Sequence, residues 1–228
     1  MEKLIIIGAG VWASEITQFV EYHNLYEIVG YAVNREYLVE EYLGRKVYNL
    51  EELDKLIEKK TKLFISISWH QKLSDVRRDI FNSLKAQGFE FANLIAPTAI
   101  IKGTNMGEGN WISDGAFLGF NTIIGDNNII LPQSLIGHHT VLGNHNALAG
   151  RACIGGACSI GDQNYIGMNA TIFNELHVGY KNIIGAGAIL KDDITDFTMV
   201  SAPESIVKKT KEKVVNLAVS AEFQKGAR

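Results

Sequence analysis

Residues 135–164 read LIGHHT VLGNHN ALAGRA CIGGAC SIGDQN, with an aliphatic residue second in every group of six. The same period runs from Ile100 to Leu190 over sixteen consecutive positions, and glycine follows ten of them. The positions are Ile100, Met106, Ile112, Leu118, Ile124, Ile130, Ile136, Leu142, Leu148, Ile154, Ile160, Ile166, Ile172, Val178, Ile184 and Leu190. Neither an α-helix, with a period of about 3.6, nor a β-strand, with a period of about 2, produces this register. A six-residue period predicts a parallel β-helix built from hexapeptides.

Each hexapeptide is expected to form one short strand and one turn, so that three hexapeptides close one triangular coil. Sixteen hexapeptides then make about five coils, stacked about 4.8 Å apart as neighbouring strands are. The aliphatic residues fill the interior of this prism. Glycine is expected where a side chain would clash at the turn, and Asn and Thr supply local hydrogen bonds there.

Charge divides the 228-residue chain into two parts. Residues 1–95 contain 26 Asp, Glu, Lys and Arg residues, whereas residues 96–192 contain 10. The first part is therefore expected to be a solvated globular domain and the second a rod whose uncharged faces are available for self-association. We place the domains at residues 1–95, 96–200 and 201–228, with Pro97 marking the first junction.

Composition also excludes several classes of function. A formal net charge of −3 argues against a general nucleic-acid binder. Nothing resembles a membrane span, and the apolar stretch 4–11 is too short and too poorly flanked for a signal peptide. Cys153 and Cys158 lie five residues apart on the predicted prism, which makes a disulfide between them unexpected and favours a reducing cytoplasm.

The first 95 residues alternate between strand and helix patterns. This alternation predicts an α/β domain with a small parallel sheet. Strands are expected at 3–7, 27–33, 62–68 and 89–95, and helices after Gly10 and at 50–58 and 73–84.

The turn after the first strand, Gly8-Ala9-Gly10-Val11-Trp12-Ala13, fits the G-x-G-x-x-A pattern of dinucleotide sites. The domain is too short for a complete dinucleotide fold, and Ala32-Val33-Asn34 stands where an acidic residue should end the second strand. An NAD site is therefore not expected. Two alternatives remain: a tight strand-to-helix turn, or amides that face the phosphate of a ligand at the helix N-terminus.

Three histidines interrupt the apolar pattern of the prism: His138, His139 and His145. Residues eighteen apart should stack in neighbouring coils, so a metal site would need further ligands at that spacing. Positions eighteen before and after the three histidines hold Phe120, Gly156, Asn121, Ala157, Asn127 and Gln163. None supplies an imidazole or carboxylate, so no metal is expected and a metal-dependent β-helix hydratase is disfavoured.

The same spacing stacks His138 on Gly156. A possible base then lies beside a backbone N–H, which is expected to be exposed and is a starting point for acyl transfer. We expect His138 to be the general base, in preference to His139 or His145.

Three stretches resemble the bacterial sugar acyltransferases that combine a short Rossmann-like N-terminal domain with a left-handed β-helix. They are IIIGAG at 5–10, NLIAPTA at 93–99 and IIGAGAILKD at 183–192. That family includes the UDP-amino-sugar N-acetyltransferases of bacillosamine synthesis and the sialic acid O-acetyltransferases. The resemblance covers about residues 1–209, and Ile136-Gly137-His138-His139 takes the place of its catalytic histidine motif. Left-handedness is implied by the resemblance alone.

The resemblance implies transfer of an acetyl group from acetyl-CoA to the amine of a nucleotide-linked amino sugar, by a homotrimer with each active site between two prisms. A sugar O-acetyltransferase is the alternative, and a non-catalytic scaffold is a third possibility. His138 would take the proton, and the N–H of Gly156 would stabilise the oxyanion. Ala186 and the stretch Ser201-Ala202-Pro203 match positions that line the pantetheine in relatives.

Several residues depart from the family pattern. Gly137 replaces a Glu, and His139 replaces an acidic residue that would orient the base; a second imidazole is not expected to do this as a carboxylate does. Two loops would approach the nucleotide. The first contains Gly8 and Gly10 and has gained Trp12, and the second, after the third expected strand, has gained Trp69. Each tryptophan either stacks on the substrate or packs in the core.

The tail after Lys209 predicts a helix capped by Thr210, with an apolar stripe that packs on the trimer. Lys208 and the lysines beside it either meet the 3′-phosphate of CoA or form a solvated basic stretch.

Overall fold

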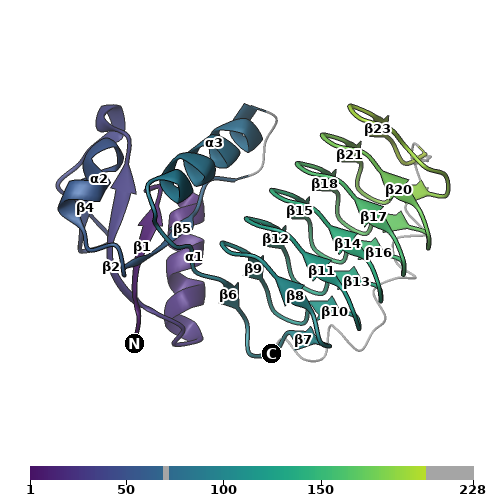
Figure 1. Cartoon of the computed structure of the whole chain (residues 1–228), viewed down its shortest axis with the longest axis horizontal. Helices are drawn as coiled ribbons and strands as arrows, with labels where there is room; N and C mark the ends of the chain where they lie inside the picture. Colours follow the sequence, from purple (N-terminus) through teal and green to yellow (C-terminus); the bar gives the residue numbers. More distant parts are fainter. Residues whose placement is uncertain (69–71, 204–228) are drawn as a thin grey trace, which may run out of the picture.

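The computed structural model describes residues 1–68 and 72–203, which form two parts that lie side by side (Figure 1). The N-terminal part is an α/β domain and the C-terminal part is a left-handed parallel β-helix, as the sequence predicted. The N-terminal elements are β1 (Lys3–Ile7), α1 (Val11–Tyr22), β2 (Glu27–Val33), the 3-10 helix η1 (Arg35–Tyr37), β3 (Glu41–Tyr42), β4 (Arg45–Asn49), the 3-10 helix η2 (Leu50–Glu52), α2 (Leu53–Leu56), β5 (Lys62–Ile65) and α3 (Lys72–Ala86).

The five strands of the N-terminal domain form one sheet in the order β3-β4-β2-β1-β5. Four of them run parallel, but β3 pairs antiparallel with β4. The sheet is therefore mixed, whereas a parallel sheet was predicted. The interior strand β1 is apolar from Leu4 to Ile7 because both its faces are covered. Leu4 and Ile6 pack with α1, whereas Ile5 and Ile7 pack with α3.

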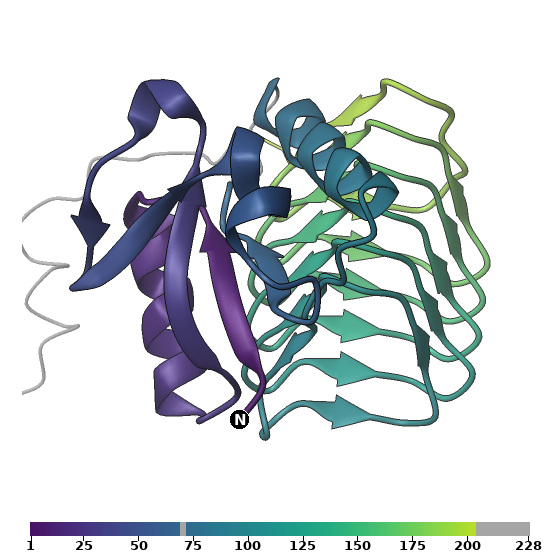
Figure 2. The same cartoon turned by 60° about the vertical axis from the view of Figure 1, so that its left-hand side comes forward.

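The β-helix has three faces, each a parallel sheet of two-residue strands (Figures 1 and 2). Face 1 contains β6 (Leu94–Ile95), β9 (Trp111–Ile112), β12 (Ile129–Ile130), β15 (Ala147–Leu148), β18 (Tyr165–Ile166), β21 (Ile183–Ile184) and β23 (Met199–Val200). Face 2 contains β7 (Ile100–Ile101), β10 (Phe117–Leu118), β13 (Leu135–Ile136), β16 (Cys153–Ile154), β19 (Thr171–Ile172) and β22 (Ile189–Leu190). Face 3 contains β8 (Asn105–Met106), β11 (Ile123–Ile124), β14 (Val141–Leu142), β17 (Ser159–Ile160) and β20 (His177–Val178). The predicted ladder of about five coils is confirmed.

The first position of the predicted ladder is wrong. Leu118 pairs with Ile101, and Ile100 points outward with 48% of its surface exposed. The regular step of six begins at Met106, because the first coil is one residue shorter than the others. Adjacent isoleucines at 100 and 101 hide this shift in the sequence.

The corners of the β-helix have two different requirements. From Asn121 to Lys181, every sixth residue is left-handed, with φ between 53° and 63°. The glycines directly after the aliphatic residues serve close stacking instead. A methyl group on Gly119 would lie 2.6 Å from the backbone nitrogen of His138 in the next coil. The predicted clash is therefore the reason for these glycines.

The N-terminal domain covers face 1 of the β-helix at β9, β12 and β15, whereas Met199 on β23 is 70% exposed. The outward side chains Trp111 and Ile129 are both only 2% exposed, because they pack with the core around α1. β6 pairs with β9 of face 1, so residues 89–95 are not the expected fourth strand of the N-terminal sheet. Only Phe91 bridges to that sheet, at Leu63.

No helix within the described ranges is long and apolar enough to cross a lipid bilayer. Residues 204–228 lie outside those ranges, and with them the predicted tail helix and Lys208.

Candidate active site

The imidazole of His138 lies over the backbone of Gly156, at the edge where face 2 turns into face 3. The pairing of β13 with β16, in which Ile136 stands opposite Ile154, brings these two residues together. A methyl group on Gly156 would lie 2.7 Å from Nε2 of His138 and 2.8 Å from its Cε1, so only glycine leaves room for the ring. His138 is exposed at this edge. The step of eighteen residues thus stacks the two residues as the sequence predicted.

His139 contacts the other ring nitrogen of His138. The two Nδ1 atoms are 3.1 Å apart, and the rings are nearly perpendicular at 83°. Nε2 of His139 lies 3.0 Å from Nδ2 of Asn121, one coil earlier. His139 therefore contacts His138 through one ring nitrogen and Asn121 through the other. The sequence analysis did not identify Asn121 as a partner of His139.

The direction of this hydrogen-bond chain decides which nitrogen of His138 carries the proton. A neutral imidazole has one N–H donor and one bare acceptor nitrogen. If Nδ2 of Asn121 donates to His139, then Nδ1 of His139 donates to His138, and the His138 proton is on Nε2. If Oδ1 of Asn121 is turned toward His139 instead, every bond reverses and Nε2 of His138 is bare. Only the second direction makes His138 a base toward a group bound over Gly156.

The sequence analysis expected the N–H of Gly156 to be exposed and free, but it is hydrogen-bonded. It donates to Oδ1 of Asn174 in the following coil, over 2.8 Å. Corner amides lie outside the strand ladder and need another acceptor, which a side chain one coil away supplies. The N–H of Asp126 is bound in the same way by Asn144, also over 2.8 Å.

Ala186 and Pro203 lie on a different edge of the prism. Both follow strands of face 1, β21 and β23, and so occupy the edge between faces 1 and 2. His138 occupies the edge between faces 2 and 3. Within one chain the structure does not bring these predicted site residues together. A single site that contains both edges would need two copies of the chain.

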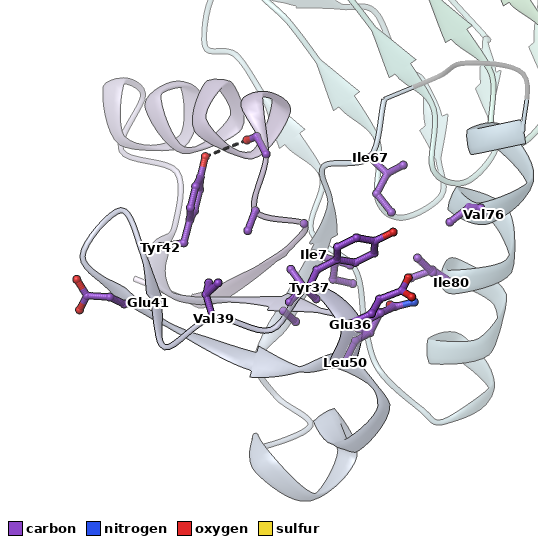
Figure 3. Close-up of a pocket in the computed structure, with 16 residues that line it drawn as sticks. Ile7, Glu36, Tyr37, Val39, Glu41, Tyr42, Leu50, Ile67, Val76 and Ile80 are labelled. Atoms are coloured by element: carbon purple, nitrogen blue, oxygen red, sulfur yellow. Dashed lines mark hydrogen bonds between the residues drawn. The ribbon is translucent and has the colours of Figure 1, made fainter.

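A second candidate region is a pocket of about 800 Å³ in the N-terminal domain (Figure 3). It lies where β1 and β2 end, the edge at which parallel sheets of α/β folds usually bind ligands. Gly8 and Gly10 line it, as expected for substrate-binding residues, together with Tyr37, Val76 and Ile80. The lining is mainly apolar, and its charged members are Glu36 and Glu41.

The glycine turn after β1 forms one part of the pocket wall. Gly8 has φ of 117°, and a methyl group on it would lie 2.5 Å from Oγ of Ser66. Gly10 is the N-cap of α1, and no side chain caps the helix there. The first-turn amides and the helix dipole favour an anion at this position.

Glu36 and Tyr37 are pocket residues that the sequence analysis missed. They lie in η1, just beyond the end of β2 at Val33, whereas an acidic residue was sought only at the strand end. A hydrogen bond with Glu36 raises the pKa of the Tyr37 hydroxyl above its usual value. The signal was present in the sequence as the first acidic residue after the second strand.

Trp12 does not line the pocket. Its ring meets the edge of Trp111, with 5.9 Å between ring centroids, and it packs on the core between the two domains. The structure therefore favours the core role for Trp12 over stacking on a substrate. Trp69 lies outside the described residues.

His145 is buried beneath α3 and is not part of the His138 site. Its Nδ1 lies 2.9 Å from Nδ2 of Asn127. Burial, and then the nearby positive charge of Arg77, lower the pKa of His145 to about 4. Across residues 1–68 and 72–203, no three His, Cys, Asp or Glu side chains are grouped so that they could hold a metal ion.

Comparison with known proteins identifies the fold. No protein-family model matches the chain, and no curated protein matches its sequence. A histidine variant of perosamine N-acetyltransferase from Caulobacter crescentus, solved with CoA and GDP-perosamine, superposes with a TM-score of 0.78. It is 21% identical, over 89% of this chain and 98% of its own.

Two further solved structures have the same architecture. The acetyltransferase domain of PglB from Neisseria gonorrhoeae, solved with acetyl coenzyme A, has a TM-score of 0.75 and 21% identity, over 87% of this chain and 95% of its own. WeeI from Acinetobacter baumannii has a TM-score of 0.72 and 17% identity, over 87% of this chain and 96% of its own. The chain therefore has the two-domain fold of these bacterial proteins. The resemblance seen in the sequence is confirmed at the level of the fold.

Proposed function

We propose that this protein is an acetyl-CoA-dependent N-acetyltransferase that acts on a nucleotide-linked amino sugar. The observation that carries the proposal is the exposed imidazole of His138 over the glycine backbone at position 156. A general base is useful only if its basic nitrogen faces the space where the acceptor amine meets the acyl group. Nε2 of His138 lies over the backbone of Gly156, because the glycine has no side chain to displace the ring, and we propose that the amine and the acyl group meet there.

In the proposed reaction His138 acts first as a general base and then as a general acid. The amine nitrogen attacks the thioester carbonyl, a C–N bond forms, and Nε2 of His138 takes a proton from the nitrogen. The C–S bond then breaks, and His138 returns the proton to the departing CoA thiolate. We propose that the Asn121 amide turns Oδ1, in place of Nδ2, toward Nε2 of His139, so that Oδ1 accepts from His139 and Nδ1 of His138 is protonated at the start.

The N-terminal pocket is proposed to hold the nucleotide. Its glycine turn offers uncapped helix amides to a pyrophosphate, and its apolar walls accept a base. Glu36 is an acceptor for donor groups of the base or the ribose.

We propose that the working enzyme is a homotrimer. Outward apolar side chains of faces 2 and 3 remain uncovered in one chain: Ile123 is 48% exposed, Val141 42% and Leu135 38%. The N-terminal domain covers face 1 at β9, β12 and β15, so we assign self-association to faces 2 and 3. Such an assembly brings the Ala186 edge of one chain toward the His138 edge of another. The free Cys153 and Cys158 and an acetyl-CoA substrate fit a reducing cytoplasm.

The test is acetyl transfer by the purified protein. Acetyl-CoA is supplied with a UDP-linked or a GDP-linked amino sugar, and release of the CoA thiol is followed together with product mass. His138→Asn keeps the size and polarity of the side chain and removes the base, so kcat should fall by about 10²- to 10⁴-fold. Its melting temperature should match wild type, because His138 is exposed. A fully active His138→Asn variant, or acetylation of sugar hydroxyls alone, contradicts the proposal.

A further inference from the structure

The proposed reaction needs a hydrogen-bond donor for the oxyanion that forms on the thioester carbonyl. The N–H of Gly156 belongs to the residue beside the His138 ring but is already bound to Oδ1 of Asn174. Using it for the oxyanion first requires that this hydrogen bond break.

Asn174 itself brings donors to the same place. Its amide orientation is fixed by chemistry, because the atom that faces an N–H donor must be the oxygen. Its Nδ2 group, with two N–H donors, therefore points away from the backbone of Gly156. Asn174 is exposed, and within the described residues no protein acceptor takes those donors.

The side chains of His138 and Asn174 converge on Gly156 from opposite sides. The three residues occupy successive coils, as the pairing of β13, β16 and β19 shows. His138 leans over Gly156 from the preceding coil. Asn174 leans back over it from the following coil, close enough that a methyl group on Gly155 would lie 2.5 Å from Oδ1. The consecutive glycines let both exposed side chains approach the same stretch of backbone, with a base on one side and a neutral donor on the other.

We propose that Asn174 is a catalytic residue whose Nδ2 donates a hydrogen bond to the thioester oxyanion. This inference rests on the proposed acetyl transfer. As the C–N bond forms, the carbonyl electron pair moves onto oxygen, where Nδ2 of Asn174 binds it. When the C–S bond breaks, the pair returns to re-form the carbonyl. The N–H of Gly156 holds Asn174 in place and does not contact the oxyanion.

Other corners of the prism show that the side chain that accepts from a corner N–H need not be an amide. Asp126, Asp162 and Asp196 bind corner N–H groups in the same way, with the last accepting from Tyr180 over 2.8 Å. A carboxylate at position 174 should therefore keep the corner intact while it removes both donors and adds a negative charge beside the oxyanion.

The experiment compares Asn174→Asp and Asn174→Ala with wild type in the acetyl-transfer assay. We expect kcat to fall by about 10²-fold in both variants, with KM for each substrate nearly unchanged, because the donor acts on charge that exists only in the transition state. Asp196→Ala, which removes an equivalent contact on an edge without site residues, is the matched control and should keep wild-type kcat. Far-UV circular dichroism and melting temperature check the fold of each.

Asn174→Ala also frees the N–H of Gly156. If that amide is the true donor, Asn174→Ala will keep or exceed wild-type kcat, and the proposal is overturned. The failure of the wider proposal has a different signature, since wild type itself would then release no CoA with any amino-sugar nucleotide. Activity in wild type that is lost in His138→Asn and retained in both Asn174 variants rejects Asn174 alone.

Discussion

The imidazole of His138 occupies the space that a side chain at position 156 would need. A methyl group there would lie 2.7 Å from Nε2, closer than non-bonded atoms tolerate. The glycine is therefore required by the position of the histidine, and not by backbone strain, since its φ is outside the left-handed region. The positions of the two residues therefore depend on each other.

Gly156→Ala should lower activity with little loss of stability. The exposed His138 ring can swing away from the new methyl group, so kcat should fall at least 10-fold while the melting temperature changes by less than about 2 °C. Gly137→Ala is the matched comparison, because its methyl group would lie 2.5 Å from backbone atoms of Gly155 and Gly156. Backbone cannot move aside, so about 1–3 kcal/mol of stability should be lost. Steady-state kinetics and thermal melts separate the two effects, and an active Gly156→Ala variant would argue against the site.

Asn121 should act through the proton position on His138. Asn121→Gly keeps the left-handed corner, where φ is 58°, and removes the hydrogen bond to His139. We expect kcat to fall about 10-fold without a change in melting temperature. Asn121→Asp can only accept from His139, so it favours the direction that leaves Nε2 of His138 bare and should retain or raise kcat. Equal activity in both variants and wild type would mean that Asn121 is only a turn residue.

Stability should rise with pH between about 4 and about 6.5 because of His145. Its pKa is about 4 in the folded protein, below the ordinary value of about 6.5 that applies when the chain is unfolded. In this window the unfolded chain binds the extra proton, so lowering the pH favours unfolding. The effect is at most roughly 3 kcal/mol at full titration.

Urea unfolding at several pH values measures the effect of His145. His145→Asn, which suits the left-handed corner at φ of 59°, should flatten the dependence. An equal slope in this variant and wild type assigns the dependence to other groups.

The N-terminal pocket and Trp12 should respond differently to mutation. Glu36→Ala and Tyr37→Ala remove pocket contacts and should raise KM for the sugar nucleotide several-fold, with KM for acetyl-CoA unchanged. Trp12→Ala should instead destabilise the protein by about 3 kcal/mol, since it empties a site in the core. Kinetics at a temperature where Trp12→Ala remains folded provide the comparison. A selective rise in sugar KM for Trp12→Ala would restore its role in substrate binding.

Val141→Glu should prevent trimer formation. A charge on the outward side of face 3 would be buried without a partner in the proposed interface. Sedimentation should then show a folded monomer without acetyl-transfer activity, because the Ala186 edge of a second chain is missing. Leu56→Glu, at an equally exposed apolar residue of α2, should leave the assembly intact. A wild-type chain that sediments as a monomer at micromolar concentration would remove the shared site.

The sequence alone determined the β-helix, because the interior of a prism imposes a strict local period. Each coil repeats the same three corners, so one aliphatic position and one close-packed glycine recur wherever the repeat continues. The period also stacks residues eighteen apart, which is why His138 and Gly156 could be paired before the structure was known. Where the period slips, at Ile100 and Ile101, two identical residues gave no signal of which one faced inward.

Only the tertiary structure decided the chemistry around that pair. Whether the N–H of Gly156 is free depends on where Asn174 directs its side chain, and the position of the His138 proton depends on contacts with His139 and Asn121. Trp12 and Trp111 meet across two domains that are far apart in the chain, so no local pattern shows that they pack together. Hydrogen-bond direction and burial are set by neighbours in space, whereas periodicity is set by neighbours in sequence. The fold could therefore be predicted from the sequence, whereas the hydrogen-bond partners of the residues at its corners could not.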